Sequence, residues 1–411
     1  MTQLKATKLG HLRKLFRPVP IPVRLLEDYY VDTAKVRGGA QVVRQLENIL
    51  RSKESELKWS GSAGESDEWR ESEQIFHEQI IFSGYRGCGK STELNRLIES
   101  IEADFLVMKF SVTQKLDPIS LHFSELFIAT MEELFGVVEE YDLYEEVSPE
   151  FLKAILDWTK TEEVESVRVK HFEVGGEAGA ELRGGLAWVG KFFGKFRLAA
   201  KSSKSMKKTL SENIEPKISE LILLCNNLLW QIEKSLGKFG KKGMLIVIED
   251  LDKVPLDVAT LLFRNYAHQL TALNTNVIFT FPLALVYNPH FTSIRGHFSK
   301  DIVLPMIKIN HQNGQQDADG RKKMADIVGC RMDLDLFERE DFLHEMIGYS
   351  GGCLRDLFLM IQEAGDHAES WDRERITKED YIHAVNGLKQ DYRNLLSDKI
   401  ETGAGGNVVK I

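Results

Sequence analysis

The chain has 411 residues, of which 43% are hydrophobic and 28% charged, and its formal net charge is −9. This length predicts two to three domains, or one domain with large insertions, and enough apolar residues for a sizeable core. The acidic balance argues against a whole-protein attraction to nucleic acid or to anionic membranes, so either kind of binding would need a local patch.

The cysteines and the apolar runs indicate the cellular compartment. The four cysteines are scattered and form no CxxC pair, which argues against a zinc site or a disulfide framework and favours a reducing compartment. The basic N-terminus lacks the continuous apolar core of a secretion signal. No apolar run is long enough to span a bilayer. We therefore expect a cytoplasmic protein without a membrane partner.

The first part of the chain divides into an arm, a helix and a loop. Residues 1–25 are basic and then rich in proline, which predicts an extended N-terminal arm. The apolar spacing over residues 32–51 indicates a helix that is entered after Gly38 and Gly39. Residues 52–74 are rich in Ser, Glu and Gly, a composition typical of a flexible surface loop.

Short, continuous apolar runs are typical of buried parallel strands, because helices cover both faces of such a sheet. The runs are Gln79–Phe82, Phe105–Phe110, Met244–Ile248, Val277–Phe281 and Ile302–Ile309. Helical patterns lie between most of these runs, which predicts a doubly wound α/β sheet.

The gap between the second and third runs is too long for one crossover, and it includes a long amphipathic pattern over about residues 215–236. Near the C-terminus, Thr377 and Asp380 are predicted to form the capping box of the last helix. The predicted organisation is an arm (1–25), a core (26–111 and 236–310, with the loop 52–74), an insertion (112–235), a helical lid (311–396) and a frayed tail (397–411).

The segment SGYRGCGKST follows the first predicted strand and matches G-x-x-x-x-G-K-[ST]. Glycines allow a tight turn whose N–H groups converge on a phosphate, and the following helix adds its partial positive charge. Lys90 would reach the β- and γ-phosphates, and the Ser91 hydroxyl would ligate Mg²⁺. A chance glycine turn is the alternative, but the flanking strand and helix favour nucleotide binding. The predicted binding residues of this loop are Gly84, Arg86, Gly87, Cys88, Gly89, Lys90, Ser91 and Thr92.

The predicted strand Met244–Ile248 ends in the acidic sequence Glu249-Asp250-Leu251-Asp252. Beside a phosphate loop, one acid at the carboxyl end of a strand can hold Mg²⁺, and a second acid can orient the attacking water. The alternative is an acidic cap on a buried strand. We assign Glu249 and Asp250 together to metal binding and catalysis. Which of the two ligates the metal and which orients the water stays open.

The phosphate loop and the acidic strand together resemble those of the AAA+ and STAND group of P-loop ATPases. In that group four apolar residues are usually followed by Asp and then by Asp or Glu, whereas this chain reads Ile-Val-Ile-Glu249-Asp250. The resemblance implies ATP and Mg²⁺ as cofactors, Glu249 at the metal, Asp250 at the water and, because Asp250 is the shorter acid, slow hydrolysis. A register shift of one residue would instead place Asp250 on Mg²⁺ and Asp252 near the water.

The same resemblance assigns three further residues. Thr280, in the fourth predicted strand, takes the place of a first sensor that contacts the γ-phosphate or its water. Arg295 takes the place of an arginine finger that acts on the neighbouring subunit's nucleotide, which implies a homo-oligomer. Arg355 resembles the second sensor of origin-recognition-type lids. The alternatives are an ordinary strand threonine, a surface arginine and an ordinary helix start.

The predicted insertion includes a basic and aromatic stretch that continues to Lys208. One helical face holds Trp188, Phe192 and Phe196, and Lys191 and Lys195 share another. Four glycines weaken a continuous helix, and an alternating pattern over residues 167–174 also allows a hairpin. The open interpretations are a nucleic-acid site over Lys191–Lys208, a helix on a membrane, a docking surface for a partner or neighbouring subunit, and a segment packed on its own core.

Three functions follow from these patterns. The leading hypothesis is an ATP-dependent switch that oligomerises and controls a partner effector, as implied by the resemblance to bacterial STAND-like ATPases of signalling and antiviral defence. The second is a DNA-associated loader or regulator that uses the basic insertion. The third is a nucleotide-holding scaffold with little turnover, suggested by the inverted Glu249-Asp250 order.

Overall fold

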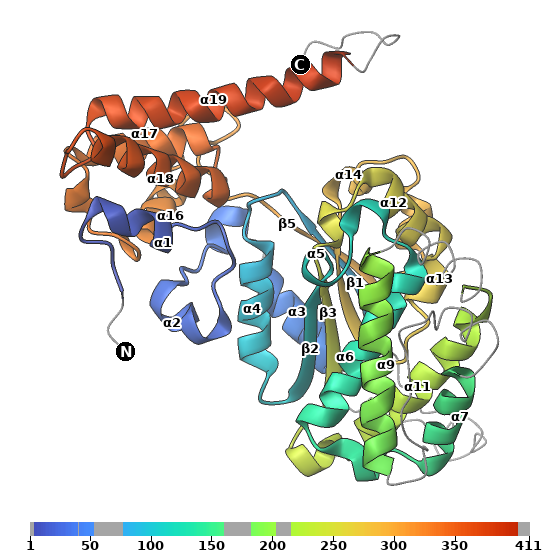
Figure 1. Cartoon of the computed structure of the whole chain (residues 1–411). Helices are drawn as coiled ribbons and strands as arrows, with labels where there is room; N and C mark the ends of the chain where they lie inside the picture. The colour runs from blue at the N-terminus through green and yellow to red at the C-terminus, as the bar shows by residue number, and fades with distance from the viewer. Residues whose placement is uncertain (1–3, 40, 53–76, 160–181, 203–214, 402–411) are drawn as a thin grey trace, which may run out of the picture. The chain divides into compact units, whose positions relative to one another are not determined.

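The computed structural model describes residues 4–39, 41–52, 77–159, 182–202 and 215–401 (Figure 1). The chain divides into two compact units. The loop–lid unit comprises Met1–Val43, Gly84–Arg96 and Leu304–Ile411, and the sheet unit comprises Arg44–Ser83 and Leu97–Val303.

A five-stranded sheet in the order β2-β3-β4-β1-β5 forms the centre of the sheet unit. The strands are β1 (Gln79–Gly84), β2 (Phe105–Ser111), β3 (Gly243–Glu249), β4 (Asn276–Phe281) and β5 (Lys300–Leu304). The pairs β2·β3, β3·β4 and β4·β1 are parallel, and most strand residues are buried. The predicted α/β fold with a parallel sheet is therefore confirmed. The last strand is shorter than predicted because Pro305, which lacks an N–H group, follows it.

Helices connect the strands and make up the C-terminal region. Those from the N-terminus to β3 are α1 (Leu12–Leu15), α2 (Leu26–Tyr29), α3 (Val42–Arg51), α4 (Lys90–Ile101), α5 (Val112–Lys115), α6 (Phe123–Glu140), α7 (Pro149–Thr159), α9 (Leu182–Ser202) and α11 (Ile218–Ser235). Those after β3 are α12 (Leu256–Thr260), α13 (Ala267–Leu270), α14 (Leu283–Val286), α15 (Phe291–Arg295), α16 (Ala318–Gly329), α17 (Glu340–Ser350), α18 (Leu354–Ser370) and α19 (Lys378–Glu401).

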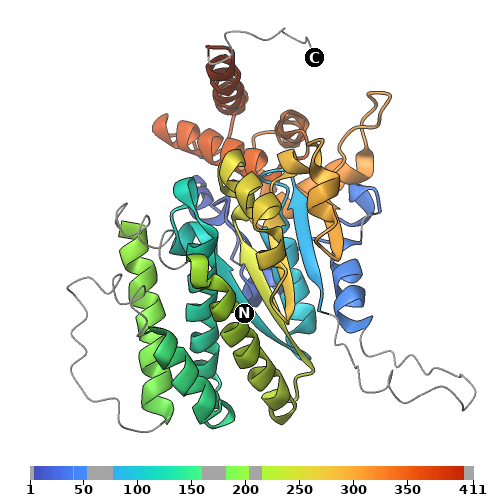
Figure 2. The same cartoon turned by 90° about the vertical axis from the view of Figure 1, so that its right-hand side faces the viewer.

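The long helices α6, α7, α9 and α11 pack together beside the sheet, as both views show (Figures 1 and 2). One continuous cluster of buried side chains runs from β2 and β3 through these helices. It includes Met108 and Ile246 on strands, Phe135 on α6 and Phe193 on α9. These helices therefore share the hydrophobic core of the sheet, which stabilises both.

Helix α9 is continuous through its glycines, which corrects the expectation that they would weaken it. The glycines allow close packing instead. A Cβ atom at Gly190 would lie 3.1 Å from the Cβ atom of Phe135, and one at Gly194 would lie 2.9 Å from Glu132 Oε1. Phe192 and Phe196 are both 3% exposed, so they are core residues and are not available to stack on bases. The predicted hairpin at 167–174 and the lysines after Ser202 lie outside the described residues.

The four helices α16–α19 lie in the range predicted as a lid, and their buried side chains belong to a second hydrophobic core. Phe342 of α17 stacks on Tyr381 of α19 at a centroid distance of 4.9 Å. The predicted capping contact is present at the start of α19, where Asp380 Oδ2 accepts hydrogen bonds from Thr377 N (2.8 Å) and Thr377 Oγ1 (2.6 Å). The Asp380 side chain is fully buried, and Oδ1 contacts Arg373 and His367.

The N-terminal residues do not form an extended arm, and that prediction was wrong. Leu9, Leu12 and Phe16 recur at helical spacing and are buried in the lid core. Phe16 packs edge-to-face on Phe358 of α18 at 5.3 Å, and Gly365 makes room for Leu12. The basic residues between them face outward, so the composition concealed an amphipathic pattern.

In the part of the chain that the structure describes, no helix combines the length and the apolar character needed to cross a bilayer.

The buried aromatic residues of α9 predict a stability effect. We expect Phe192→Ala to lower the free energy of unfolding by about 3–5 kcal/mol, because it leaves a cavity in the shared core. Leu223→Ala on α11 is the control, since Leu223 is 70% exposed and should change stability by about 0.5 kcal/mol or less. Urea denaturation followed by circular dichroism measures both. Equal effects of the two substitutions would contradict the burial of Phe192.

The Asp380 cluster predicts a pH-dependent contribution to stability. Burial raises the pKa of Asp380, but hydrogen bonds from Thr377, His367 and Arg373 outweigh it and hold this pKa below its ordinary value. A carboxyl with a lowered folded pKa stabilises the protein above its unfolded pKa and loses this contribution as the pH falls. We expect Asp380→Asn to cost about 1–3 kcal/mol near pH 7. This difference should shrink below about pH 4.

Urea unfolding of both proteins between pH 3 and pH 7 measures this difference. The exposed Glu374→Gln is the control and should show no such pH dependence. A deficit of Asp380→Asn that stays constant over the whole pH range would contradict the prediction.

Candidate functional site

The strand order places a topological switch point between β1 and β4. After β1 the chain continues to β2, at one edge of the sheet. After β4 it continues to β5, at the opposite edge. Ligands of open α/β sheets bind outside the carboxyl ends of the strands at such a point. Ser83 pairs with Phe281, and Ile248 pairs with Phe279, so β1, β4 and β3 end at the same edge of the sheet. The loops that follow these ends contain the predicted site residues.

The loop between β1 and α4 has the backbone geometry of a phosphate cradle. Gly87 and Gly89 have φ values of 89° and 102°, a region that favours glycine. Lys90 begins α4, and its Nζ donates to the carbonyl oxygens of Gly84 (2.9 Å) and Tyr85 (3.1 Å). The lysine thus spans the loop that it belongs to. The amino end of α4 adds a partial positive charge beside it.

The remaining loop residues have different environments. Cys88 is 1% exposed, and a Cβ atom at Gly84 would lie 3.0 Å from its sulfur, so a small side chain is needed here. The Arg86 side chain is exposed, and Ser91 and Thr92 are half-buried. These positions leave Ser91 within the first turn of α4, as a metal-binding hydroxyl of this loop requires.

The start of α18 contacts the phosphate loop within the loop–lid unit. A Cβ atom at Gly87 would lie 2.7 Å from both Arg355 Cβ and Cys353 Sγ, and the Cys353 thiol lies 3.7 Å from the carbonyl oxygen of Arg86. Gly352 has a φ of 85°, and a Cβ atom there would lie 2.0 Å from Ile307 O. Glycine is therefore required at the turn that brings Arg355 to the loop.

A third segment that contacts the loop carries no recognisable sequence pattern. Residues 21–37 lie along the loop and the first turns of α4. Ile21 N donates to Thr92 Oγ1 (3.3 Å), Asn95 Nδ2 donates to Ile21 O (2.7 Å), and Tyr30 donates to Glu93 Oε2 (3.1 Å). The buried Arg37 donates from Nη2 to Cys88 O (2.7 Å). These residues belong to no motif, so only the fold brings them to the loop.

At the end of β3 the two acids have different surroundings. Glu249 Oε2 contacts Lys109 Nζ at 2.7 Å, but Oε1 is buried and accepts no hydrogen bond from any described residue. Asp250 has a φ of 70° and accepts from Ser111 (2.6 Å), Thr113 (2.5 Å) and Lys253 (2.5 Å). Burial raises the pKa of Asp250, but these three donors outweigh it and hold the pKa below its ordinary value.

The unpartnered Glu249 oxygen suits a hard cation. A buried carboxylate oxygen without a partner costs free energy, and Mg²⁺ takes oxygen ligands. Among the described residues no three His, Cys, Asp or Glu side chains converge to form a metal cage. Mg²⁺ usually takes only one or two carboxylates together with substrate phosphates and waters, so the residues present fit this metal.

Thr280 and Arg295 both lie in the sheet unit. Thr280 is 1% exposed, and its Oγ1 accepts from Leu251 N (3.0 Å) and lies 3.3 Å from Ile248 O. The threonine therefore ties β4 to the turn that presents Asp250. The Arg295 side chain is 61% exposed, and its Nε lies 2.6 Å from Asp301 Oδ1.

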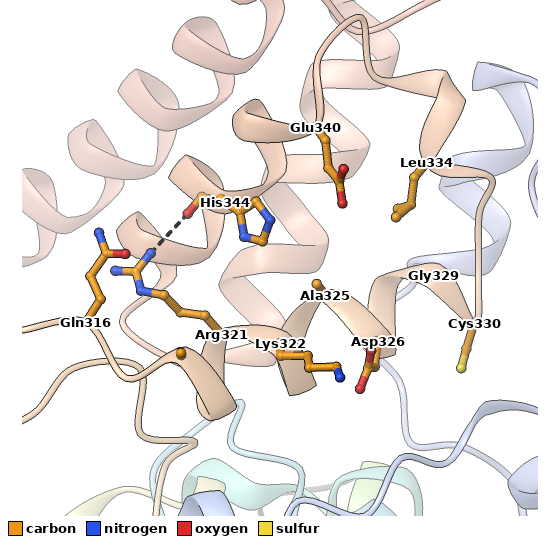
Figure 3. Close-up of a pocket in the computed structure, with 11 residues that line it drawn as sticks. Gln316, Arg321, Lys322, Ala325, Asp326, Gly329, Cys330, Leu334, Glu340 and His344 are labelled. Carbon is orange, nitrogen blue, oxygen red and sulfur yellow. Dashed lines mark hydrogen bonds between the residues drawn. The ribbon is translucent and has the colours of Figure 1, made fainter.

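The lid also holds a groove of about 750 Å³ between α16 and α17 (Figure 3). Its lining combines the apolar Ala325 and Leu334 with Lys322, Asp326 and Glu340. Arg321 crosses one end and donates from Nη1 to the carbonyl oxygen of His344 (3.2 Å). None of the predicted site residues lines this groove.

No protein-family model matches the chain, and no curated protein does. Among solved structures, it is similar to Cdc6p from Pyrobaculum aerophilum, with a TM-score of 0.40, 14% identity and coverage of 90% of this chain and 69% of that one.

Two structures from Aeropyrum pernix are similar as well. The ORC2 protein in its ADP form has a TM-score of 0.39 and 11% identity, with 91% and 72% of the two chains covered. The ORC1 protein in complex with DNA has a TM-score of 0.37 and 14% identity, with 94% and 70% covered. At these TM-scores the similarity carries no argument about the site or its chemistry.

Proposed function

We propose that the protein is an AAA+-like ATPase that acts as a nucleotide-dependent switch. The observation that carries the proposal is the phosphate loop, which leaves β1 at the switch point of a parallel sheet and has Lys90 across it. A glycine-rich loop at this place is suited to a di- or triphosphate. The cytoplasmic location predicted from the sequence is part of the same proposal.

In the proposed mechanism, the N–H groups of Gly84–Thr92 and the Lys90 ammonium would bind the ATP phosphates, and Ser91 and Glu249, both assigned from the sequence, would hold Mg²⁺. The cation, when bound, supplies positive charge that stabilises the transferring phosphoryl group. Asp250 orients the attacking water, because the hydrogen bonds from Ser111 and Thr113 keep its carboxylate ionised and fixed. The unpartnered Oε1 atom supports the assignment of Glu249 to the metal.

The switch role is supported by the contact between α18 and the loop. Cys353 and Arg355 lie against Arg86 and Gly87, so a change in the loop on nucleotide binding would act directly on the lid. The exposed Arg295 is proposed to reach a neighbouring subunit's nucleotide in a homo-oligomer, after release from Asp301. Control of a partner effector, in antiviral defence, is the finer proposal and rests on the sequence resemblance.

A DNA-associated regulator is the second candidate, and the outer face of α9 favours it. Lys191, Lys195 and Lys201 are exposed on this helix, whereas Phe192, Phe193 and Phe196 are buried and Trp188 is half-buried. Binding would therefore be mainly electrostatic, and it should weaken steeply with salt. Lys191→Glu combined with Lys195→Glu should abolish it in a fluorescence anisotropy titration at low salt. No binding by the unaltered protein at low salt would eliminate this candidate.

The role of Lys90 gives the first test of the ATPase proposal. We expect Lys90→Ala to weaken ATP binding by about tenfold to a hundredfold, because a charge-assisted contact to phosphate is lost. Isothermal titration calorimetry measures the affinity, and native mass spectrometry with and without ATP measures assembly. Lys195→Ala, on the exposed face of α9, is the control. If Lys90→Ala bound ATP and assembled like the unaltered protein, the switch proposal would be abandoned.

The acids of β3 give the second test. We expect Glu249→Gln to remove most of the dependence of ATP affinity on Mg²⁺ concentration. Asp250→Asn should keep this dependence and lose phosphate release. Asp252→Asn should leave both unchanged. Phosphate release abolished by Asp252→Asn would instead support the shifted register, and no release by the unaltered protein above background would favour the scaffold with little turnover.

A further inference from the structure

The buried Arg37 joins three segments of the loop–lid unit. Arg37 is 3% exposed, and its guanidinium donates hydrogen bonds to three oxygen acceptors. Nε donates to Thr33 Oγ1 (2.7 Å), Nη2 donates to Cys88 O (2.7 Å), and Nη1 donates to Pro305 O, directly after β5. A planar guanidinium can serve three acceptors in fixed directions, which a lysine ammonium cannot do with the same geometry.

The contact with Cys88 O fixes the direction of one peptide group in the phosphate loop. The peptide between Cys88 and Gly89 is trans, so its N–H group points away from its carbonyl oxygen. Because Arg37 holds the carbonyl oxygen, the Gly89 N–H group is directed to the side away from the guanidinium. Glycine at φ 102° imposes little rotational preference of its own, so an external contact is needed to keep this orientation.

We propose that Arg37 is a positioning residue of the phosphate loop, which holds the Cys88–Gly89 peptide with its N–H group directed at the nucleotide phosphate. This inference rests on the proposed function, since it assumes that the loop binds phosphate. Arg37 does not contact the nucleotide in this proposal. It lowers the cost of binding because the loop is already in the orientation that a phosphate requires.

The same arginine connects the loop to the segment that leads into the lid. Besides the bond to Pro305 O, the N–H group of Lys308 donates to the carbonyl oxygen of Val36 (2.8 Å). A change in the orientation of the Cys88–Gly89 peptide would therefore alter the hydrogen bonds to residues 305–308. This path is separate from the contact of α18 with Gly87.

A buried counter-charge lies near Arg37. Glu93, in the first turn of α4, is 8% exposed and accepts a hydrogen bond from Tyr30. Burial raises the pKa of Glu93, and the Arg37 charge opposes this rise. The buried guanidinium is thus compensated without a carboxylate in direct contact, which leaves its donors for the carbonyl oxygens.

The test compares nucleotides that differ in the number of phosphates available to the loop. ATP, ADP and AMP are titrated by calorimetry into the unaltered protein, Arg37→Met and Arg37→Lys. We expect Arg37→Met to weaken ATP and ADP binding by about tenfold or more and AMP binding by less than about twofold. The ATP and ADP affinities of Arg37→Lys should lie between those of the unaltered protein and Arg37→Met. Lysine keeps the positive charge but loses the planar arrangement of the guanidinium donors.

A matched control is Arg331→Met. Arg331 is also buried in the loop–lid unit, but its guanidinium donates to Ile327 O and lies over the rings of Phe358 and Tyr29, so its hydrogen bond does not go to a carbonyl oxygen of the phosphate loop. This variant loses a buried arginine and should keep the ratio of ADP to AMP affinity. If Arg37 contributed only to overall stability, Arg37→Met would weaken the binding of ATP, ADP and AMP equally. The ratio of ADP to AMP affinity would then be unchanged, and this result would overturn the inference.

A second readout does not depend on nucleotide binding. In hydrogen exchange without nucleotide, the peptide that covers Tyr85–Thr92 should exchange faster in Arg37→Met than in the unaltered protein, and Arg331→Met should leave it unchanged. Thr33→Val removes one acceptor and keeps the guanidinium, so it should also speed exchange of this peptide, but by less. This variant replaces Arg37→Met if Arg37→Met does not fold. No difference in this peptide for any Arg37 or Thr33 variant would overturn the inference.

The two proposals fail in different ways. If the unaltered protein bound neither ATP nor ADP, the proposed function would fail, while the exchange experiment would still report on Arg37. If it bound both nucleotides and the Arg37 variants discriminated ADP from AMP as the unaltered protein does, only the positioning role would fail.

Discussion

The parallel pairing of β4 with both β1 and β3 is the constraint on which the rest of the structure depends. Its register places the carboxyl ends of these strands at one edge of the sheet. Since the connections leave β1 and β4 toward opposite sides, this edge is a topological switch point. Thr280, in the middle strand, then uses its hydroxyl to fix the turn after β3. The strand order therefore determines where phosphate chemistry is possible.

A glycine-rich loop is a weak structural element by itself, because glycine loses more conformational entropy on folding than other residues. In this protein the phosphate loop is supported from outside by two segments that are distant in sequence. The start of α18 packs on Gly87, and the N-terminal segment holds Cys88 O and Thr92 through Arg37 and Ile21. The same supports favour the proposed switch role, since a change in the loop would alter its contacts with α18.

The helices between β2 and β3 combine two roles on opposite faces. Phe192 and Phe196 of α9 are buried in the core that these helices share with the sheet, and Gly190 permits the close approach of α6. Lys191 and Lys195 remain on the outer face. A partner that contacts this outer face would therefore meet charged side chains, because the two phenylalanines are already buried in the core.

The sequence by itself determined the parallel α/β sheet and the loop after β1, because continuous apolar runs and the G-x-x-x-x-G-K-[ST] spacing are local patterns. It also located the capping contact of Thr377 and Asp380, which depends only on residues three apart. It did not reveal the packing of Leu12 and Phe16 on α18, since basic and proline residues obscured their spacing. Only the tertiary structure decided that Arg37 holds the phosphate loop, that Glu249 keeps an unpartnered oxygen and that Asp250 has three donors. The physical reason is that these contacts join residues far apart along the chain, and no local periodicity records which of them the strand order brings together.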